Sequence, residues 1–343
     1  MTTAEPCPAS PTLAEVARVA GVSLATASRV LNRVPLVHPE TRRQVESTMA
    51  ALGYRRHRAA RTAPPPRTRS VALVVCEESL RLFSDPYFAR LATGVGREVT
   101  AAGMQLVLLT VPSTKDHQAP AMDYLGGGSV DGALFVSVHG RNPLKPGRIG
   151  IPVVVAGRPV PGGDKDPVSY VDVDNHGGAV QAVRRLVDSG RSVIATVAGP
   201  RDMTAGFDRL AGYRQVMAQT ERSDHGLVYF GDFSQVSGEH ATARLLERKP
   251  RVDAIFTASD LMAVGVLRAL RRAGRRVPDD VAVVGFDDLP IGRHTDPPLT
   301  TVRQPTEELG ARMARELLRL MDDSCAPRCG IMLDTELVPR ASA

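Results

Sequence analysis

Residues 12–53 constrain the fold most, because only a tight turn separates their first two helical patterns. Thr12 and Glu15 have the spacing of a capping box, so we predict that a helix begins just after Thr12. Gly21 suits the left-handed position that ends such a helix, and Ser23 can cap a second helix at once. Two short helices joined this closely are typical of a helix-turn-helix.

A third helix is predicted to complete this head. Pro39 is typical of the first turn of a helix, and Gly53 favours its end. Apolar residues at helical spacing predict one small core, made of Leu13, Val16, Ala17, Ala20, Ala27, Val30, Leu31, Val45, Met49 and Leu52. The first 53 residues therefore predict an all-α domain of helix-turn-helix geometry.

The second helix leaves Leu24, Ala25, Ser28, Arg29 and Asn32 on its outer face. Leu24 and Ala25 can contact thymine methyl groups, and Arg29 can reach a guanine or a phosphate. The hydroxyls of Ser23, Thr26 and Ser28 suit phosphate oxygens near a helix N-terminus. The alternative is a generic three-helix bundle with a solvated polar face.

The charge distribution favours DNA over that alternative. The chain has 43 basic and 37 acidic residues, a net charge of +6. Residues 1–70 contain 11 Arg and only 4 acidic residues, so the remaining 273 residues are close to neutral. A basic module attached to a neutral body indicates a polyanionic partner for that module.

The run of residues 12–32 closely resembles the DNA-binding head of the lactose-repressor (LacI/GalR) family, and Leu52-Gly53-Tyr54 resembles the end of that head. The resemblance implies that Leu24, Ala25 and Arg29 read bases in the major groove of double-stranded DNA. It also implies DNA-binding or supporting roles for Ser23, Thr26, Ser28, Asn32 and Tyr54.

Residues 55–69 correspond to the segment that forms a short hinge helix on DNA in that family. His57 and Arg58 fit the start of such a helix, but Ala63 occupies the position of a leucine that wedges into the minor groove. Pro64-Pro65-Pro66 follows at once and disfavours helix at Ala63. A shortened hinge helix that contacts DNA through His57, Arg58 and Ala63 and a stiff proline-rich spacer both remain open.

The rest of the chain alternates short apolar runs with amphipathic helical patterns. Strands are predicted at residues 71–76, 105–110, 133–136, 152–156, 193–198, 227–230, 254–257, 281–285 and 331–338. Helices between them are predicted at residues 89–102, 176–189, 210–219 and 261–273. This order predicts an α/β body of two doubly wound lobes.

The body carries further motifs of the same family, among them Asp85-Pro86-Tyr87-Phe88, Gly285-Phe286-Asp287-Asp288 and Pro298-Leu299-Thr300-Thr301. The resemblance implies a periplasmic-binding-protein-like body with three crossing strands and a ligand in the cleft. The expected division is a disordered N-terminus (1–11), the head (12–54), a hinge (55–69) and the body (70–343). Lobe 1 is expected at about 70–165 plus 296–328, and lobe 2 at about 166–295 plus 329–343.

Carried over by position, the resemblance implies ten effector contacts: Asp85, Tyr87, Phe88, Arg158, Arg209, Phe233, Ser259, Asp260, Asp287 and Gln304. Arg209 would donate to ligand hydroxyls or a carboxylate, Asp287 would accept from hydroxyls, and Phe233 would stack on a ring. Phe233 as plain core, Asp287 as a turn cap and Arg209 as an ion-pair partner remain alternatives. An Asp, an Arg and an aromatic side chain in one cleft suit a sugar or, alternatively, a nucleoside. Two departures from the family pattern bear on which ligand is bound: Gly157-Arg158 replaces a common acidic residue, and Ser259 stands where Asn is usual.

Other protein classes lack their motifs in this sequence. No dinucleotide motif, P-loop or catalytic constellation is found, so we expect neither an enzyme nor a cofactor. Cys325 and Cys329 resemble half a metal site without a second half, so we expect no metal and reduced thiols. No signal peptide or apolar span is found, which favours the cytoplasm over an exported solute-binding protein.

Together these features predict a transcription regulator, most often a repressor in this family. A homodimer is expected because two related heads match a palindromic operator. No heptad tail follows the last predicted strand, so a tetramer is not expected. Ligand is expected to rotate the lobes and, through the hinge, to change the spacing of the heads.

Overall fold

The computed structural model describes residues 11–31, 37–52, 54, 68–112, 118–140, 146–159, 168–323 and 325–343. The chain divides into two compact units, Met1–Arg67 and Thr68–Ala343. No helix within these described ranges is both long and apolar enough to cross a membrane.

The first unit contains three helices, α1 (Leu13–Val19), α2 (Leu24–Leu31) and α3 (Pro39–Leu52). The predicted capping box is confirmed, because Thr12 and Glu15 satisfy each other's backbone N–H groups. Gly21 has φ of +63° and makes the turn, and the Ser23 hydroxyl accepts from the Thr26 N–H at 3.1 Å. Eight of the ten expected core residues pack together, and the two exceptions are the last residues of α2 and α3: Leu31 is only half-buried and lies outside the cluster, and Leu52 is exposed.

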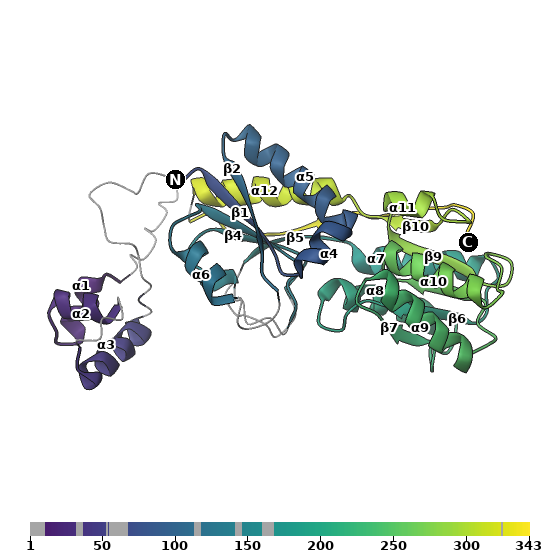
Figure 1. Cartoon of the computed structure of the whole chain (residues 1–343), viewed down its shortest axis with the longest axis horizontal. Coiled ribbons are helices and arrows are strands. Elements are labelled where there is room, and N and C mark those ends of the chain that lie inside the picture. Colours follow the sequence, from purple (N-terminus) through teal and green to yellow (C-terminus); the bar gives the residue numbers. More distant parts are fainter. Residues whose placement is uncertain are drawn as a thin grey trace, which may run out of the picture. The chain divides into compact units, whose positions relative to one another are not determined.

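The second unit contains two lobes, each built on a six-stranded sheet (Figure 1). The sheet of lobe 1 is parallel, in the order β11 (Gly330–Leu333), β5 (Ser169–Val173), β4 (Val153–Ala156), β3 (Gly132–Val136), β1 (Ser70–Val75) and β2 (Gln105–Thr110). One face is covered by α5 (Pro86–Ala101) and α12 (Thr306–Asp322), whose apolar side chains join those of the strands in one core. The remaining helices of this lobe are α4 (Ser79–Ser84), α6 (Gln118–Gly126) and the 3-10 turn η2 (Pro146–Arg148).

The sheet of lobe 2 has the order β12 (Glu336–Val338), β10 (Thr300–Arg303), β9 (Ala282–Asp287), β8 (Ala254–Thr257), β6 (Ile194–Ala198) and β7 (Val228–Phe230). Only β12 is antiparallel to its neighbour among these strands. Separate cores lie on the two faces, one under α7 (Asn175–Asp188) and α8 (Thr204–Gln219), the other under α9 (Gln235–Arg248) and α10 (Asp260–Arg272). A short helix, α11 (Pro290–Arg293), follows β9.

The chain crosses between the lobes at other points than the sequence suggested. Strand β5 belongs to lobe 1, β10 belongs to lobe 2, and the predicted strand at residues 331–338 is split into β11 in lobe 1 and β12 in lobe 2. The expected boundaries at residues 165, 296 and 329 are therefore wrong. These strands are short and lie toward the ends of each sheet order, and their apolar patterns do not encode which sheet they join.

Candidate functional site

A cavity of about 850 Å³, including its open mouth, lies between the lobes of the body. It lies where the carboxyl ends of strands from the two sheets face each other, the usual place for a ligand in open α/β sheets. Nine of the ten expected effector contacts line it: Asp85, Tyr87, Phe88, Arg158, Arg209, Phe233, Ser259, Asp287 and Gln304.

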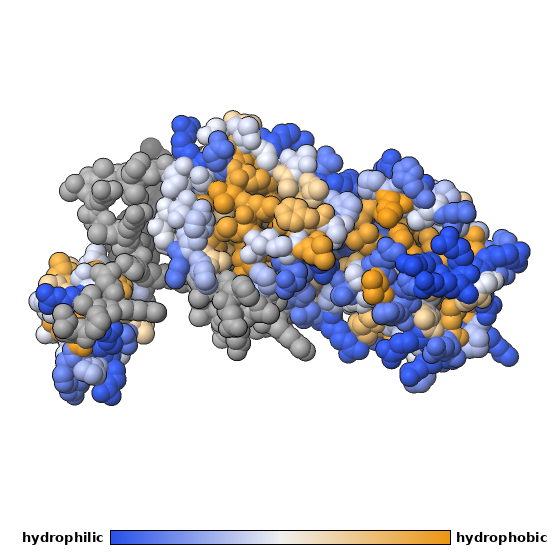
Figure 2. All heavy atoms as spheres, in the orientation of Figure 1, coloured by the Kyte–Doolittle hydropathy of each residue, from blue (hydrophilic) through white to orange (hydrophobic). Residues whose placement is uncertain are grey.

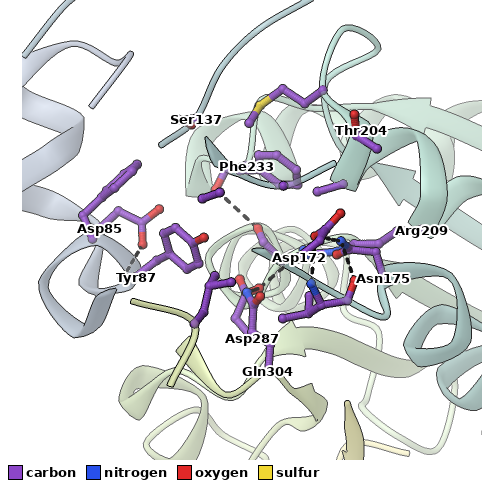
Figure 3. A pocket seen from close by; sticks show the side chains of 18 of the residues that line it. Asp85, Tyr87, Ser137, Asp172, Asn175, Thr204, Arg209, Phe233, Asp287 and Gln304 are labelled. Atoms are coloured by element: carbon purple, nitrogen blue, oxygen red, sulfur yellow. Dashed lines mark hydrogen bonds and ion pairs between the residues drawn. The ribbon is translucent and has the colours of Figure 1, made fainter. Parts of the chain in front are cut away.

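A buried charged network forms the floor of this cavity (Figure 3). The Arg209 guanidinium donates to Asn175 Oδ1 at 2.9 Å and to the carbonyl of Ala258 at 2.5 Å, and lies 3.4 Å from Asp287 Oδ1. Gln304 Nε2 donates to the same Asp287 oxygen at 2.6 Å. Four elements, α7, α8, β9 and the end of β10, thus place their polar groups at one point.

The electrostatics of this floor follow from its burial. Burial raises the pKa of the Asp287 carboxyl, although the nearby Arg209 opposes that change. Burial also lowers the pKa of Arg209, again against the effect of Asp287. Such a pair is costly to bury unless its remaining hydrogen-bonding capacity is used, so the floor is suited to a polar ligand rich in hydroxyls.

Aromatic side chains form the walls. Phe233 has φ of +69°, and the centre of its ring lies 5.9 Å from the Arg81 guanidinium and 5.8 Å from that of Arg209. Tyr87 faces it from lobe 1 (Figure 3). Phe88 packs edge-on against Tyr87 at 5.4 Å and belongs mainly to the core of lobe 1.

Two of the expected contacts mainly hold other elements in place. Asp85 caps α5 by accepting from the Tyr87 N–H at 2.9 Å. Ser259 caps α10 by accepting from the Met262 N–H at 3.2 Å, and its hydroxyl donates to the Phe233 carbonyl at 3.3 Å. Both residues thereby fix the aromatic walls of the cavity.

Asp260 does not line the cavity, contrary to the expectation. It is fully buried, accepts from the Thr301 hydroxyl at 2.5 Å and from the Leu289 N–H at 2.8 Å, and so joins α10 to β10 and to the loop after β9. Burial raises the pKa of its carboxyl, and the charge of Asp287 raises it further. The Asp260 carboxylate points toward β10 and the loop after β9 because its two donors lie there.

Sequence reasoning missed several lining residues, among them Arg81, Ser137, Asp172, Asn175 and Thr204. Asp172 is buried at the end of β5 and accepts from Asn175 Nδ2 at 2.9 Å and from the Arg158 N–H at 2.8 Å. Asp172 lies near the end of β5 and Asn175 begins α7, so polar residues at a strand-to-helix junction were the available signal.

The head presents the face that the sequence predicted. Leu24, Ala25 and Arg29 are exposed on α2, while Ala27 and Val30 are buried. The Ser23 and Thr26 hydroxyls lie 2.8 Å apart, Ser28 is half-buried, and Tyr54 packs against the core of the head. Asn32, His57, Arg58 and Ala63 lie outside the described residues.

The described ranges contain no group of three or more His, Cys, Asp or Glu side chains that could hold a metal ion. Cys76, Cys325 and Cys329 are free thiols, and burial raises the pKa of the Cys76 thiol to about 12.

Known proteins match the chain over almost its whole length. Residues 12–57 match the family described as bacterial regulatory proteins, lacI family, and residues 183–343 match the periplasmic binding protein-like domain. The HTH-type transcriptional regulator CelR of Thermobifida fusca is 46% identical over 97% of this chain and 98% of that protein. The ribose operon repressor of Escherichia coli K12 is 31% identical over 97% of this chain and 99% of that protein.

Two solved structures of regulators from this family also resemble the chain. A CelR–cellobiose complex is 43% identical, with a TM-score of 0.79 over 97% of this chain and 100% of that chain. A lac repressor dimer bound to operator and the anti-inducer ONPF is 26% identical, with a TM-score of 0.70 over 97% of this chain and 98% of that chain. The chain therefore belongs to the lacI family of bacterial regulatory proteins and is a DNA-binding transcription regulator, not an enzyme.

Proposed function

We propose that this chain is a homodimeric repressor that binds a palindromic operator through α2 and binds a sugar between its lobes, and that the sugar changes its affinity for the operator. The observation that carries the sugar assignment is the buried floor of Arg209, Asp287 and Gln304 beside the Phe233 ring. Charged donors and acceptors satisfy hydroxyls, and an aromatic face packs on the C–H surface of a sugar ring.

The relatives support a sugar of the glucoside class. The structure most similar among those compared above is a CelR–cellobiose complex, and the match covers 97% of this chain. We therefore take cellobiose as the first ligand to test.

The exposed face of α2 supports the operator assignment. Leu24, Ala25 and Arg29 are exposed on α2, and we assign them to base contacts and the Ser23, Thr26 and Ser28 hydroxyls to phosphates. Asn32, Tyr54, His57, Arg58 and Ala63 complete the proposed DNA contacts. Because DNA lies in the cytoplasm of a bacterium, we propose that location for the protein.

Exposed apolar side chains support the dimer. Leu80 and Phe83 on α4 are 82% and 79% exposed, and Leu108 on the edge strand β2 is 45% exposed. Figure 2 shows apolar surface gathered over the lobe that carries them. A patch of this kind on a soluble protein marks an interaction surface, and we assign it to a second copy of the chain.

The operator assignment is tested with DNA fragments selected from genomic DNA by the purified chain. Arg29→Ala is expected to weaken binding to the selected sequence by about 1–3 kcal/mol and to relax the base preference at one position. Arg18→Ala on the exposed surface of α1 is the matched control. Equal losses for both variants, on selected and random DNA alike, would show that α2 does not read the sequence.

The sugar assignment is tested by thermal shift and by operator binding with cellobiose, ribose, glucose and a purine nucleoside. We expect cellobiose to raise the melting temperature and to change operator affinity, and Arg209→Met to abolish both effects. Arg214→Met on the exposed side of α8 is the control. A response to the nucleoside alone would replace the sugar assignment, and no response to any of them would contradict it.

A further inference from the structure

One rim of the cleft is joined by protein contacts between the lobes. The segment that leads into α8 of lobe 2 approaches the ends of β3 and β4 of lobe 1. The Gly140 N–H donates to the Asp202 carbonyl at 2.7 Å, and the Thr204 hydroxyl donates to the Arg158 carbonyl at 2.7 Å.

Charged side chains join the same two elements. Arg158 Nη2 lies 2.8 Å from both carboxylate oxygens of Asp208. His139 lies between Asp202 of lobe 2, at 3.2 Å from Nδ1, and Glu77 of lobe 1, at 3.4 Å from Nε2. The Arg158–Asp208 and His139–Asp202 pairs connect one lobe to the other, whereas His139–Glu77 lies within lobe 1.

The backbone of Arg158 is fixed in lobe 1. Its N–H donates to the buried carboxylate of Asp172 at 2.8 Å, next to the left-handed Gly157 at φ of +88°. The side chain therefore starts from a rigid position and reaches across the mouth of the cavity. Asp208, 15% exposed, receives it from the helix that also carries Arg209 at the cavity floor.

We propose that Asp208 is a positioning residue: it holds Arg158 across the mouth of the cavity, and this pair keeps the lobes closed before any ligand arrives. The proposal concerns the regulation of the ligand site and rests on the proposed function. It also revises the expected role of Arg158, whose guanidinium is engaged by Asp208 and acts on the ligand through lobe closure.

The free energy that closes the lobes then comes partly from these protein contacts and partly from the ligand. Contacts that already favour the closed arrangement reduce the conformational cost that the ligand must meet, so they raise its affinity. The same contacts must break when a ligand enters or leaves, so they slow its exchange. Arg158 is 38% exposed, which limits the expected effect on affinity to about three- to fivefold.

The first test needs no ligand. Spin labels are placed at Asp123→Cys on α6 and Ala218→Cys on α8, with Cys7, Cys325 and Cys329 changed to Ser and the labelled chain diluted with unlabelled chain. We expect one narrow interlobe distance in the parent chain and a longer, broader distribution after Asp208→Asn. Asp224→Asn, which removes an ion pair of α8 within lobe 2, is the matched control and is expected to change nothing.

The second test uses cellobiose as the probe. Asp208→Asn and Arg158→Gln are each expected to weaken its binding about three- to fivefold and to speed its dissociation, and the double variant is expected to equal either single variant. An unchanged interlobe distance in Asp208→Asn overturns the proposal. A loss in Arg158→Gln that persists undiminished in the Asp208→Asn background also overturns it, because Arg158 would then contact the ligand directly. Absence of cellobiose binding to the parent chain would contradict the proposed ligand, while the distance measurement would still decide the proposal on closure.

Discussion

Replacing Arg209 with Met is expected to destabilise the body by about 3–5 kcal/mol, because it breaks a buried ion pair from one side. Arg209 is 5% exposed and is the donor for Asn175 Oδ1, the Ala258 carbonyl and Asp287 Oδ1. Met fills a similar volume, so the change removes donors and charge with little loss of packing.

The loss of stability expected for Arg209→Met has two parts. The two neutral acceptors left without a donor cost about 1–3 kcal/mol each, at the lower end where water in the cavity can reach them. The rest comes from the Asp287 carboxyl, whose pKa burial already raises and which loses its only ion-pair partner among the described residues, keeping the Gln304 amide and the Asp260 backbone N–H as neutral donors. Removing that carboxyl as well should recover most of the second part.

Asp287→Asn therefore provides the diagnostic comparison. Alone it should destabilise the body, because it leaves the buried Arg209 without a carboxylate. In the Arg209→Met background it should be neutral or stabilising, which corresponds to a coupling of about 1–3 kcal/mol.

Urea unfolding of the full chain followed by tyrosine fluorescence measures these differences. The chain contains no Trp, and five of its six Tyr lie in the body, so the signal reports mainly on that unit. Arg214→Met, on the exposed side of the same helix, should change stability by less than about 0.5 kcal/mol. If the effects of Arg209→Met and Asp287→Asn add to within about 0.5 kcal/mol, the ion pair does not hold the floor together and the reasoning fails.

Three further changes have defined outcomes. Hydrogen bonds to Glu77 and Asp202 raise the pKa of His139, so its stabilising effect is complete below about pH 6.5 and is lost as pH rises through the raised pKa. His139→Gln should accordingly flatten the decline of melting temperature above that pH, and an unchanged slope would refute this. Gly310→Ala would place a Cβ 2.2 Å from the Leu91 carbonyl where α12 crosses α5, so calorimetry should show a loss of about 1–3 kcal/mol; a fully stable variant would disprove that contact. Gly199→Ala would place a Cβ 2.5 Å from the Phe233 ring and should weaken cellobiose binding by about three- to tenfold in titration calorimetry, a prediction that fails if affinity is retained.

Local signals in the sequence determined the three helices of the head and the alternation of strands and helices in the body. The capping box at Thr12, the left-handed Gly21 and the cap at Ser23 act through contacts only two or three residues away, so they can be read from spacing. The apolar runs of β1, β3, β8 and β9 are buried, as expected for strands covered on both faces. Nine of the ten expected effector contacts line the cavity, and they came from resemblance to a family, which transfers long-range information that the residues do not carry by themselves.

Tertiary structure decided the points at which distant segments meet. In the sequence, Asp260 and Asp287 look alike, as acids at the end of a strand or the start of a helix. In the structure, Asp260 accepts hydrogen bonds from Thr301 and Leu289 away from the cavity, whereas Asp287 lines the cavity. Arg158 was expected to contact a ligand, but Asp208, 50 residues away, engages its guanidinium. The sheets joined by β5, β10 and β11 were also set by pairing between distant strands. Each outcome depends on donors and acceptors brought together by the packing of the lobes, and no local spacing in the chain encodes that proximity.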